Sequence, residues 1–173
     1  VYVLIFCTIS CVSQVEEDPS KAIKEFFSLQ EERIKCYKRL DQHHLEYLDT
    51  SPDYDFPVYR QAVHECTQEF SRISQCIIAV EERFQGEFQN AEIARLIGKV
   101  QENEKRKLEL TGMMQLIKQK HQEEPNPESE EDLTQLKLRY VGKLIHWNCF
   151  DGVLWAQFHQ AVKQKLLLDK FLC

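Results

Sequence analysis

The chain has 173 residues, of which 43% are hydrophobic and 29% are charged, with only five glycines and five prolines. This composition is typical of one helical domain and leaves too few turn residues for a fold of many strands. The formal net charge of -6 disfavours a surface that holds nucleic acid by neutralising phosphates, so protein partners are expected.

The seven cysteines favour reduced thiols over a disulfide framework. Their number is odd, Cys36, Cys66 and Cys76 fall within helical pattern, and no C-x-x-C pair occurs. We therefore expect a nuclear or cytoplasmic location and no secretion.

The first 17 residues open with an apolar run that resembles the core of a secretory signal. The run has no basic region before it, and it is shorter than the roughly 20 apolar residues that span a membrane. We expect residues 1–17 to be an extension outside a helical domain of residues 18–147, with no membrane insertion.

A first helix is predicted over residues 19–48, because Asp18 can cap its free amides and Pro19 suits its first turn. The apolar face of this helix is broad enough for two neighbouring helices. Its predicted members are Ile23, Phe26, Phe27, Ile34, Tyr37, Leu40, His44, Tyr47 and Leu48.

A second helix is predicted over residues 57–84, after a turn that the prolines of segment 49–57 impose. Its apolar residues follow one another at steps of four and three, which places them on one seam. They are Tyr59, Val63, Cys66, Phe70, Ile73, Ile77, Val80 and Phe84, with Phe56 also assigned to packing. Such a seam needs partner helices, from the same chain or from a second copy in a homodimer.

A third helix is predicted over residues 90–121, with Asn90 as its N-cap. Asn103 and Lys107 interrupt its apolar seam, either as a register device or as a frayed contact. An acidic linker follows, then a fourth helix over residues 130–147 with an imperfect capping box at Ser129 and Asp132. Its inward stripe would be Leu133, Leu136, Tyr140, Leu144 and Trp147, and residues 148–173 would form a separate tail.

These patterns together predict an all-α fold, an antiparallel helical bundle or coiled-coil hairpins of three to four long helices. The short motifs of phosphate loops, dinucleotide folds, serine hydrolases and zinc peptidases are missing from the sequence. We therefore expect no enzymatic activity, no catalytic residue and no cofactor.

Histidines and acidic residues at the junction of the first two helices are the best metal-binding candidates. They are His43, His44 and Glu46 on the first helix and His64, Glu65 and Cys66 on the second. Neighbouring residues on a helix point about 100° apart and no i, i+4 pair of ligands recurs, so no metal site is predicted. His44 is expected to be a ring at the edge of the core that a neighbour satisfies.

Basic residues on the first and third helices alternate with glutamates. They are Arg33, Lys35, Lys38 and Arg39, then Lys99, Lys105, Arg106 and Lys107. This pattern is typical of a solvated face of mixed charge and disfavours direct nucleic-acid binding.

Several short segments carry a resemblance to a known family. They are Leu29 to Arg33, Tyr37 to Leu40, Tyr47-Leu48, Tyr54-Asp-Phe-Pro-Val-Tyr-Arg60, Val63-His-Glu65, Thr67-Gln68 and Leu133-Thr-Gln-Leu-Lys137. From about Ile23 to Ile145 the chain resembles the required for excision 1-B domain family. The resemblance implies a small eukaryotic helical protein linked to excision repair of DNA, with no assigned enzymatic activity. Residues 1–17 and the break at 148–152 depart from the family pattern.

We therefore expect a non-enzymatic helical adaptor or accessory protein in a DNA-repair assembly. A helical adaptor in a trafficking or cytoskeletal assembly is the alternative. The candidate partner-binding residues are Asp55, Arg60, His64 and Glu65, which the corner between the first two helices presents beside a packed hairpin.

Overall fold

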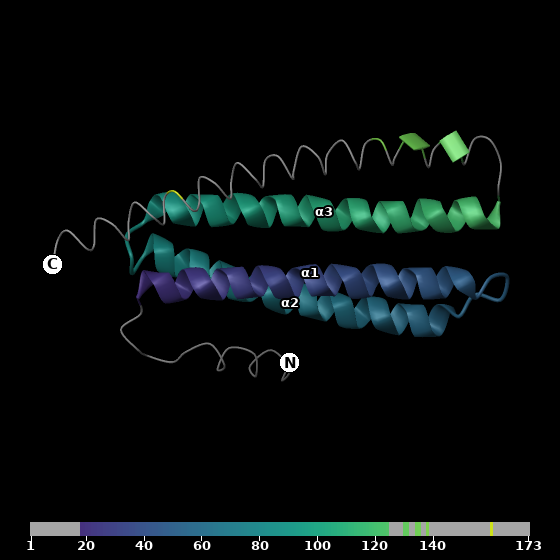
Figure 1. The fold of residues 1–173 in the computed structure, drawn as a ribbon, viewed down its shortest axis with the longest axis horizontal. Helices are drawn as coiled ribbons and strands as arrows, with labels where there is room; N and C mark the ends of the chain where they lie inside the picture. The colour runs from purple at the N-terminus through teal and green to yellow at the C-terminus, as the bar shows by residue number, and fades with distance from the viewer. Residues whose placement is uncertain (1–17, 125–129, 132–133, 136–137, 139–159, 161–173) are drawn as a thin grey trace, which may run out of the picture.

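Three long helices run up, down and up again: α1 over Pro19–Asp49, α2 over Phe56–Gln85 and α3 over Ala91–Glu123 (Figure 1). The computed structural model describes residues 18–124, 130–131, 134–135, 138 and 160, and these residues contain no strand. The predicted all-α fold is confirmed.

The predicted fourth helix can be followed only at a few positions. The residues described between 130 and 138 are helical and exposed. The capping box at Ser129 and Asp132, the inward stripe, residues 1–17 and nearly all of the tail lie outside the described residues. The assignment of residues 18–147 to one domain stays a prediction.

Local capping fixes where each helix begins. The side chains of Asp18, Asp55 and Asn90 each accept a hydrogen bond from a backbone N–H two or three residues on, at 2.9, 3.3 and 3.1 Å. These bonds satisfy amides that the first turn leaves unpaired. The caps predicted at Asp18 and Asn90 are confirmed.

The main apolar core joins all three helices at the end that holds the α2–α3 turn. It is built from the first half of α1, the second half of α2 and the first turns of α3. Its members are Ala22, Ile23, Phe26, Leu29, Ile73, Ile77, Val80, Phe84, Ile93, Ala94, Leu96 and Ile97. The seam predicted for α2 therefore packs against helices of the same chain.

A second apolar cluster belongs almost wholly to α1 and α2. It contains Cys36, Tyr37, Leu40, Cys66 and Phe70, and α3 adds only the partly buried Leu108. The second half of α3 is therefore not held to the hairpin by a large apolar core.

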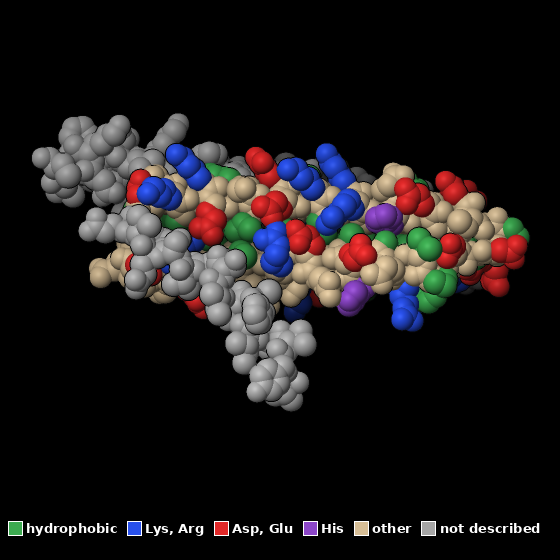
Figure 2. Space-filling model, turned by 90° about the horizontal axis from the view of Figure 1, so that it is seen from below, with side chains coloured by type: hydrophobic (Ala, Val, Ile, Leu, Met, Phe, Trp, Pro, Cys, Tyr) green, Lys and Arg blue, Asp and Glu red, His purple; other side chains and the backbone are tan. Residues whose placement is uncertain are grey.

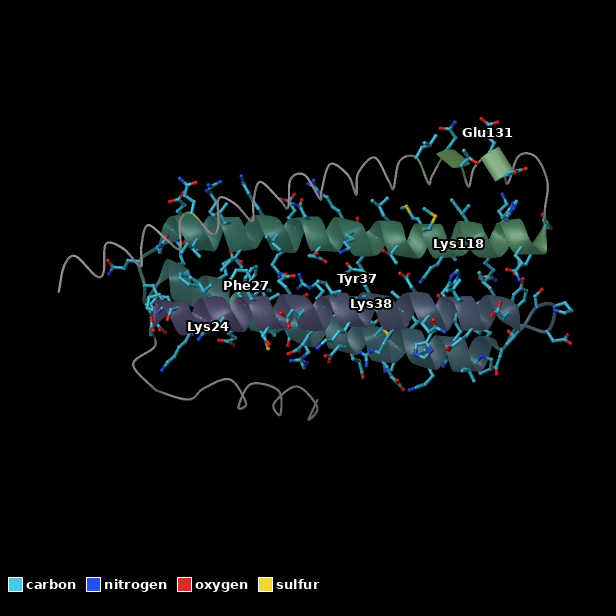
Figure 3. All side chains as sticks on the ribbon, in the orientation of Figure 1. Lys24, Phe27, Tyr37, Lys38, Lys118 and Glu131 are labelled. Atoms are coloured by element: carbon cyan, nitrogen blue, oxygen red, sulfur yellow. The ribbon has the colours of Figure 1, made fainter. Side chains whose placement is uncertain are left out.

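Polar side chains hold the middle and the second half of α3 instead. The Tyr37 hydroxyl donates to the Glu104 carbonyl at 3.2 Å, and Tyr37 faces α3 across the space between the helices (Figure 3). Farther along, Gln122 Nε2 donates to the Leu48 carbonyl at 2.7 Å. Lys107, one of the polar residues on the predicted seam, places its Nζ 4.4 Å from the centroid of the Tyr37 ring, a cation–π distance.

Arg33 lies at the centre of this polar contact and is only 3% exposed. Its Nη2 donates to Ser74 Oγ at 3.2 Å and to Gln101 Oε1 at 2.6 Å, and so joins all three helices. Burial lowers the pKa of the guanidinium, and the nearby Glu104 carboxylate opposes that shift. The prediction that Arg33 lies on a solvated face is wrong, because an arginine can reach a partner helix that the sequence of its own helix does not reveal.

Two residues predicted to pack are exposed. Ile34 is 51% exposed, because the inward direction at this turn is occupied by Arg33 and Cys36. Phe56 is 54% exposed, because Tyr54 takes the closing position and its ring centroid lies 5.0 Å from that of Tyr47.

The α2 seam gives the first prediction. Ile73 is 0% exposed, and Ile73→Asp or Phe70→Asp should abolish the cooperative thermal transition measured by circular dichroism. Burying an unpaired carboxylate costs several kcal/mol, against a total stability of roughly 5–15 kcal/mol. Gln75→Asp, at an exposed position of the same helix, should melt close to the wild type. A near-native transition for Ile73→Asp would contradict the buried seam.

The buried guanidinium gives the second prediction. Arg33→Ala should lower the free energy of unfolding in urea by about 1–3 kcal/mol, because Gln101 and Ser74 lose a buried partner. The double variant Arg33→Met with Gln101→Leu should recover much of that loss, since both polar groups are removed together. Lys38→Ala, at an exposed position, should change stability by no more than about 0.5 kcal/mol. Equal effects of Arg33→Ala and Lys38→Ala would show that the network contributes nothing.

Candidate partner-binding surface

Stacked aromatic rings close the end of the α1–α2 hairpin. The rings of Tyr47 and Tyr59 are stacked with centroids 4.6 Å apart, and the His44 ring lies 5.7 Å from Tyr59. Below the stack, Thr50 Oγ1 accepts a hydrogen bond from the Asp55 amide at 3.0 Å. The corner between α1 and α2 is therefore a packed structure from which nearby side chains project in fixed directions.

The four predicted partner-binding residues do not form one cluster. Asp55 is exposed and caps α2. His64 and Glu65 are exposed and pair within their own helix, His64 Nε2 with Gln68 at 3.0 Å and Glu65 with Gln61 at 2.9 Å. Arg60 is also exposed and lies one turn before His64 on the same face of α2, whereas Glu65 points about 100° away from His64.

A shallow open hollow lies between α1 and α2 at this corner. Its volume is about 410 Å³, and it is lined by His43 of α1 and by Pro57, Val58, Gln61, Ala62 and Glu65 of α2. Glu65 is the only predicted site residue that lines it. Val58 is 62% exposed, and the sequence signal for it is an apolar residue that falls off the heptad seam.

The rim of the hollow is acidic. On the α1 side, Glu46 accepts hydrogen bonds from Gln42 at 2.9 Å and from His43 at 3.1 Å, and these bonds hold its pKa below the ordinary value. Glu65 lies on the opposite side of the hollow, on α2. The hollow thus combines an apolar floor with carboxylates on both helices.

The groove farther along α1 and α2 has a different character. Arg72 pairs there with both Glu32 and Glu69, and Arg83 pairs with Glu25. In Figure 2, basic and acidic side chains alternate over much of this face, while acidic and hydrophobic ones predominate toward the right-hand end. The arginines and glutamates along the groove pair with one another, whereas the carboxylates at the corner have no lysine or arginine partner among the described residues.

The histidines, cysteine and acidic residues considered as metal ligands remain apart. Among residues 18–124 and the few described beyond them, no group of three or more histidine, cysteine, aspartate or glutamate side chains could share an ion. In the same part of the chain, no helix combines the length and apolar character needed to cross a membrane.

His44 and Cys66 are buried titratable groups inside the bundle. His44 is 2% exposed, and its Nε2 has no hydrogen-bond partner among the described residues. Burial is the main cause that lowers the pKa of His44, and the positive charge of Lys118 lowers it further. Burial raises the pKa of the Cys66 thiol to about 11, and the contact with Cys36 adds to this shift. At neutral pH both groups are therefore uncharged and belong to packing.

Comparison with known proteins places the three helices among proteins of one family. The model of the family DNA repair REX1-B matches residues 21–118. A Mus musculus protein named Required for excision 1-B domain-containing protein is 35% identical over 119 residues, which cover 69% of each chain. A Bos taurus protein of the same name is 35% identical over 95 residues, which cover 55% of this chain and 53% of the relative. No solved structure matches the chain.

The buried imidazole gives the third prediction, on the pH dependence of stability. Because the folded protein lowers the pKa of His44, the unfolded chain takes up a proton below about pH 6.5 that the folded state resists. The contribution of His44 to the free energy of unfolding is therefore fully present above that pH. It is lost as the pH falls, by at most roughly 1.4 kcal/mol per pH unit.

Urea titrations between pH 7.5 and 5 measure this effect. His44→Phe should weaken the pH dependence of unfolding, whereas His64→Phe, at an exposed position, should leave it as in the wild type. Identical pH profiles for the wild type and His44→Phe would contradict the assignment.

Proposed function

Because the chain belongs to the DNA repair REX1-B family, we propose that it is a non-enzymatic helical adaptor or accessory protein in excision repair of DNA. It binds a protein partner, in the nucleus or in the cytoplasm before nuclear entry. The observation that supports this proposal most directly is the α1–α2 corner, where a packed aromatic end holds an exposed apolar hollow with acidic groups around it. A rigid surface of this kind suits binding better than chemistry.

The distribution of titratable groups supports a non-catalytic role. Arg33, His44 and Cys66 are buried groups whose pKa values are shifted by burial, and none of them lines the hollow. Active sites usually place such groups in a cleft where a substrate can reach them. In this chain they are used for packing the three helices together.

The net charge supports a protein partner rather than direct contact with DNA. The chain carries -6, and two of its exposed arginines, Arg72 and Arg106, are paired with glutamates. A protein that binds phosphates needs free cations on one face. A link to repair would then pass through another protein.

A deletion experiment tests the repair role. Cells from which the gene is deleted should remove bulky DNA lesions more slowly, and the full wild-type chain should restore the rate. Affinity purification of the same chain with mass spectrometry should recover repair proteins. Unchanged lesion removal, together with partners confined to transport or cytoskeletal assemblies, would favour the alternative adaptor function and overturn the proposal.

The Arg60–His64 face gives the fourth prediction. Arg60→Glu combined with His64→Ala should remove at least one partner from the purification, because both side chains are exposed on one face of α2. Arg95→Glu, an equal change of charge at an exposed position on α3, is the matched control and should keep the wild-type set. An unchanged set for the double variant would exclude this face as the binding surface.

A further inference from the structure

We infer that the hollow between α1 and α2 binds a basic amphipathic helix of a partner protein, which inserts one large apolar side chain between His43 and Val58. This inference rests on the proposed adaptor function and names the chemistry of the partner. Three observations on the described residues carry it: the apolar floor, the concentration of negative charge and the shape of the groove.

The floor of the hollow exposes apolar surface that the fold itself does not need. Val58 is 62% exposed and lies off the α2 seam. Covering such a side chain would gain about 25 cal/mol for each Å² removed from water.

Negative charge is concentrated at this corner to an unusual degree. Residues 41–65 hold six carboxylates, Asp41, Glu46, Asp49, Asp53, Asp55 and Glu65, and one guanidinium, Arg60. Their net charge is -5, compared with -6 for the whole chain. None of these carboxylates forms an ion pair with a lysine or arginine in the described part of the chain, whereas the glutamates farther along the groove pair with Arg72 and Arg83.

Unpaired carboxylates around an apolar floor select a cationic partner. Lysine or arginine side chains would meet Glu46 on one side of the hollow and Glu65 on the other, which speeds encounter and fixes orientation. The same charge disfavours nucleic acid, and it disfavours a symmetric contact between two copies of this corner, because like charges would face each other.

The groove geometry favours a helix as the occupant. The hollow is open to solvent between two antiparallel helices, and its walls come from His43 on α1 and from positions 57, 58, 61, 62 and 65 on α2. A helix placed in such a groove presents anchors three or four residues apart on one face and keeps its charges on the flanks.

Binding of designed peptides to the purified full chain tests the inference. The probe is a fluorescent 18-residue peptide with leucines on one face and lysines on the flanks. One comparison peptide replaces the lysines with glutamates, and the other replaces the central leucines with serines. Fluorescence anisotropy should show that the first peptide binds at least about tenfold more tightly than either comparison peptide.

Variants of the protein locate the binding site. Val58→Ser and Glu65→Lys should each weaken binding of the basic peptide by about tenfold, and binding should also weaken as salt is added. Ile78→Ser is the matched control, since Ile78 is an exposed apolar residue on the same helix, and it should bind like the wild type. Circular dichroism melting checks that all three variants fold.

Three results would overturn the inference. Equal binding of the basic peptide to the wild type and to Val58→Ser would show attraction by charge alone. Tight binding of the acidic peptide would exclude the charge argument. Self-association of the wild-type chain in sedimentation, lost in Val58→Ser, would make a second copy the occupant. None of these results would change the rate of lesion removal in deletion cells. That rate tests the repair role separately from this binding site.

Discussion

Burial of one continuous apolar seam on α2 is the constraint on which the rest of the structure depends. Ile73, Ile77, Val80 and Phe84 are wholly buried between α1 and the first turns of α3. Removing these large side chains from water supplies the main favourable free energy of the fold, and it can do so only if both neighbouring helices are in place. The tight turn at Gly86 to Asn90 and the caps at Asp55 and Asn90 then fix the direction in which α3 returns.

The second half of α3 is attached by a different kind of interaction. Tyr59 donates to Gln115 and Gln122 donates to the Leu48 carbonyl in this half, and Arg33 and Tyr37 bond to the middle of the helix, where apolar burial is already small. Such bonds contribute about 0.5–1.5 kcal/mol each, but they are directional, so they specify register more than they add stability. Asn103 and Lys107, which interrupt the apolar seam of α3, belong to this polar stretch, and Lys107 lies over the Tyr37 ring. The contact of Lys107 favours the register device at that position, whereas Asn103 Nδ2 is buried without a hydrogen-bond partner, so both interpretations of Asn103 stay open.

The uneven distribution of apolar burial along the bundle also determines where the candidate binding surface lies. The apolar end of the bundle carries the stability, which leaves the opposite end, closed by the Tyr47–Tyr59 stack, to present unpaired charge and the exposed Val58. Six exposed carboxylates and a buried Ala62 are compatible with a folded hairpin because the aromatic stack and the Asp55 cap hold the corner together. Family membership is the basis of the proposed link to DNA repair, and the corner is the surface proposed for contact with a partner.

Interactions within a few residues of the chain were determined by the sequence alone. The caps, the prolines of the first turn and the four-and-three spacing on α2 act over one or two turns, so the helical fold and the buried seam could be predicted from them. Contacts between helices were decided only by the tertiary structure. Arg33 is buried because Ser74 and Gln101 reach it, and Gly98, which looks like a weak point of α3, faces Glu81 so closely that a Cβ would lie 2.9 Å from its Oε1. The hollow is formed by His43 of α1 and Val58 of α2, and its acidic rim also takes residues from both helices. Such a surface between helices exists only once their crossing is fixed.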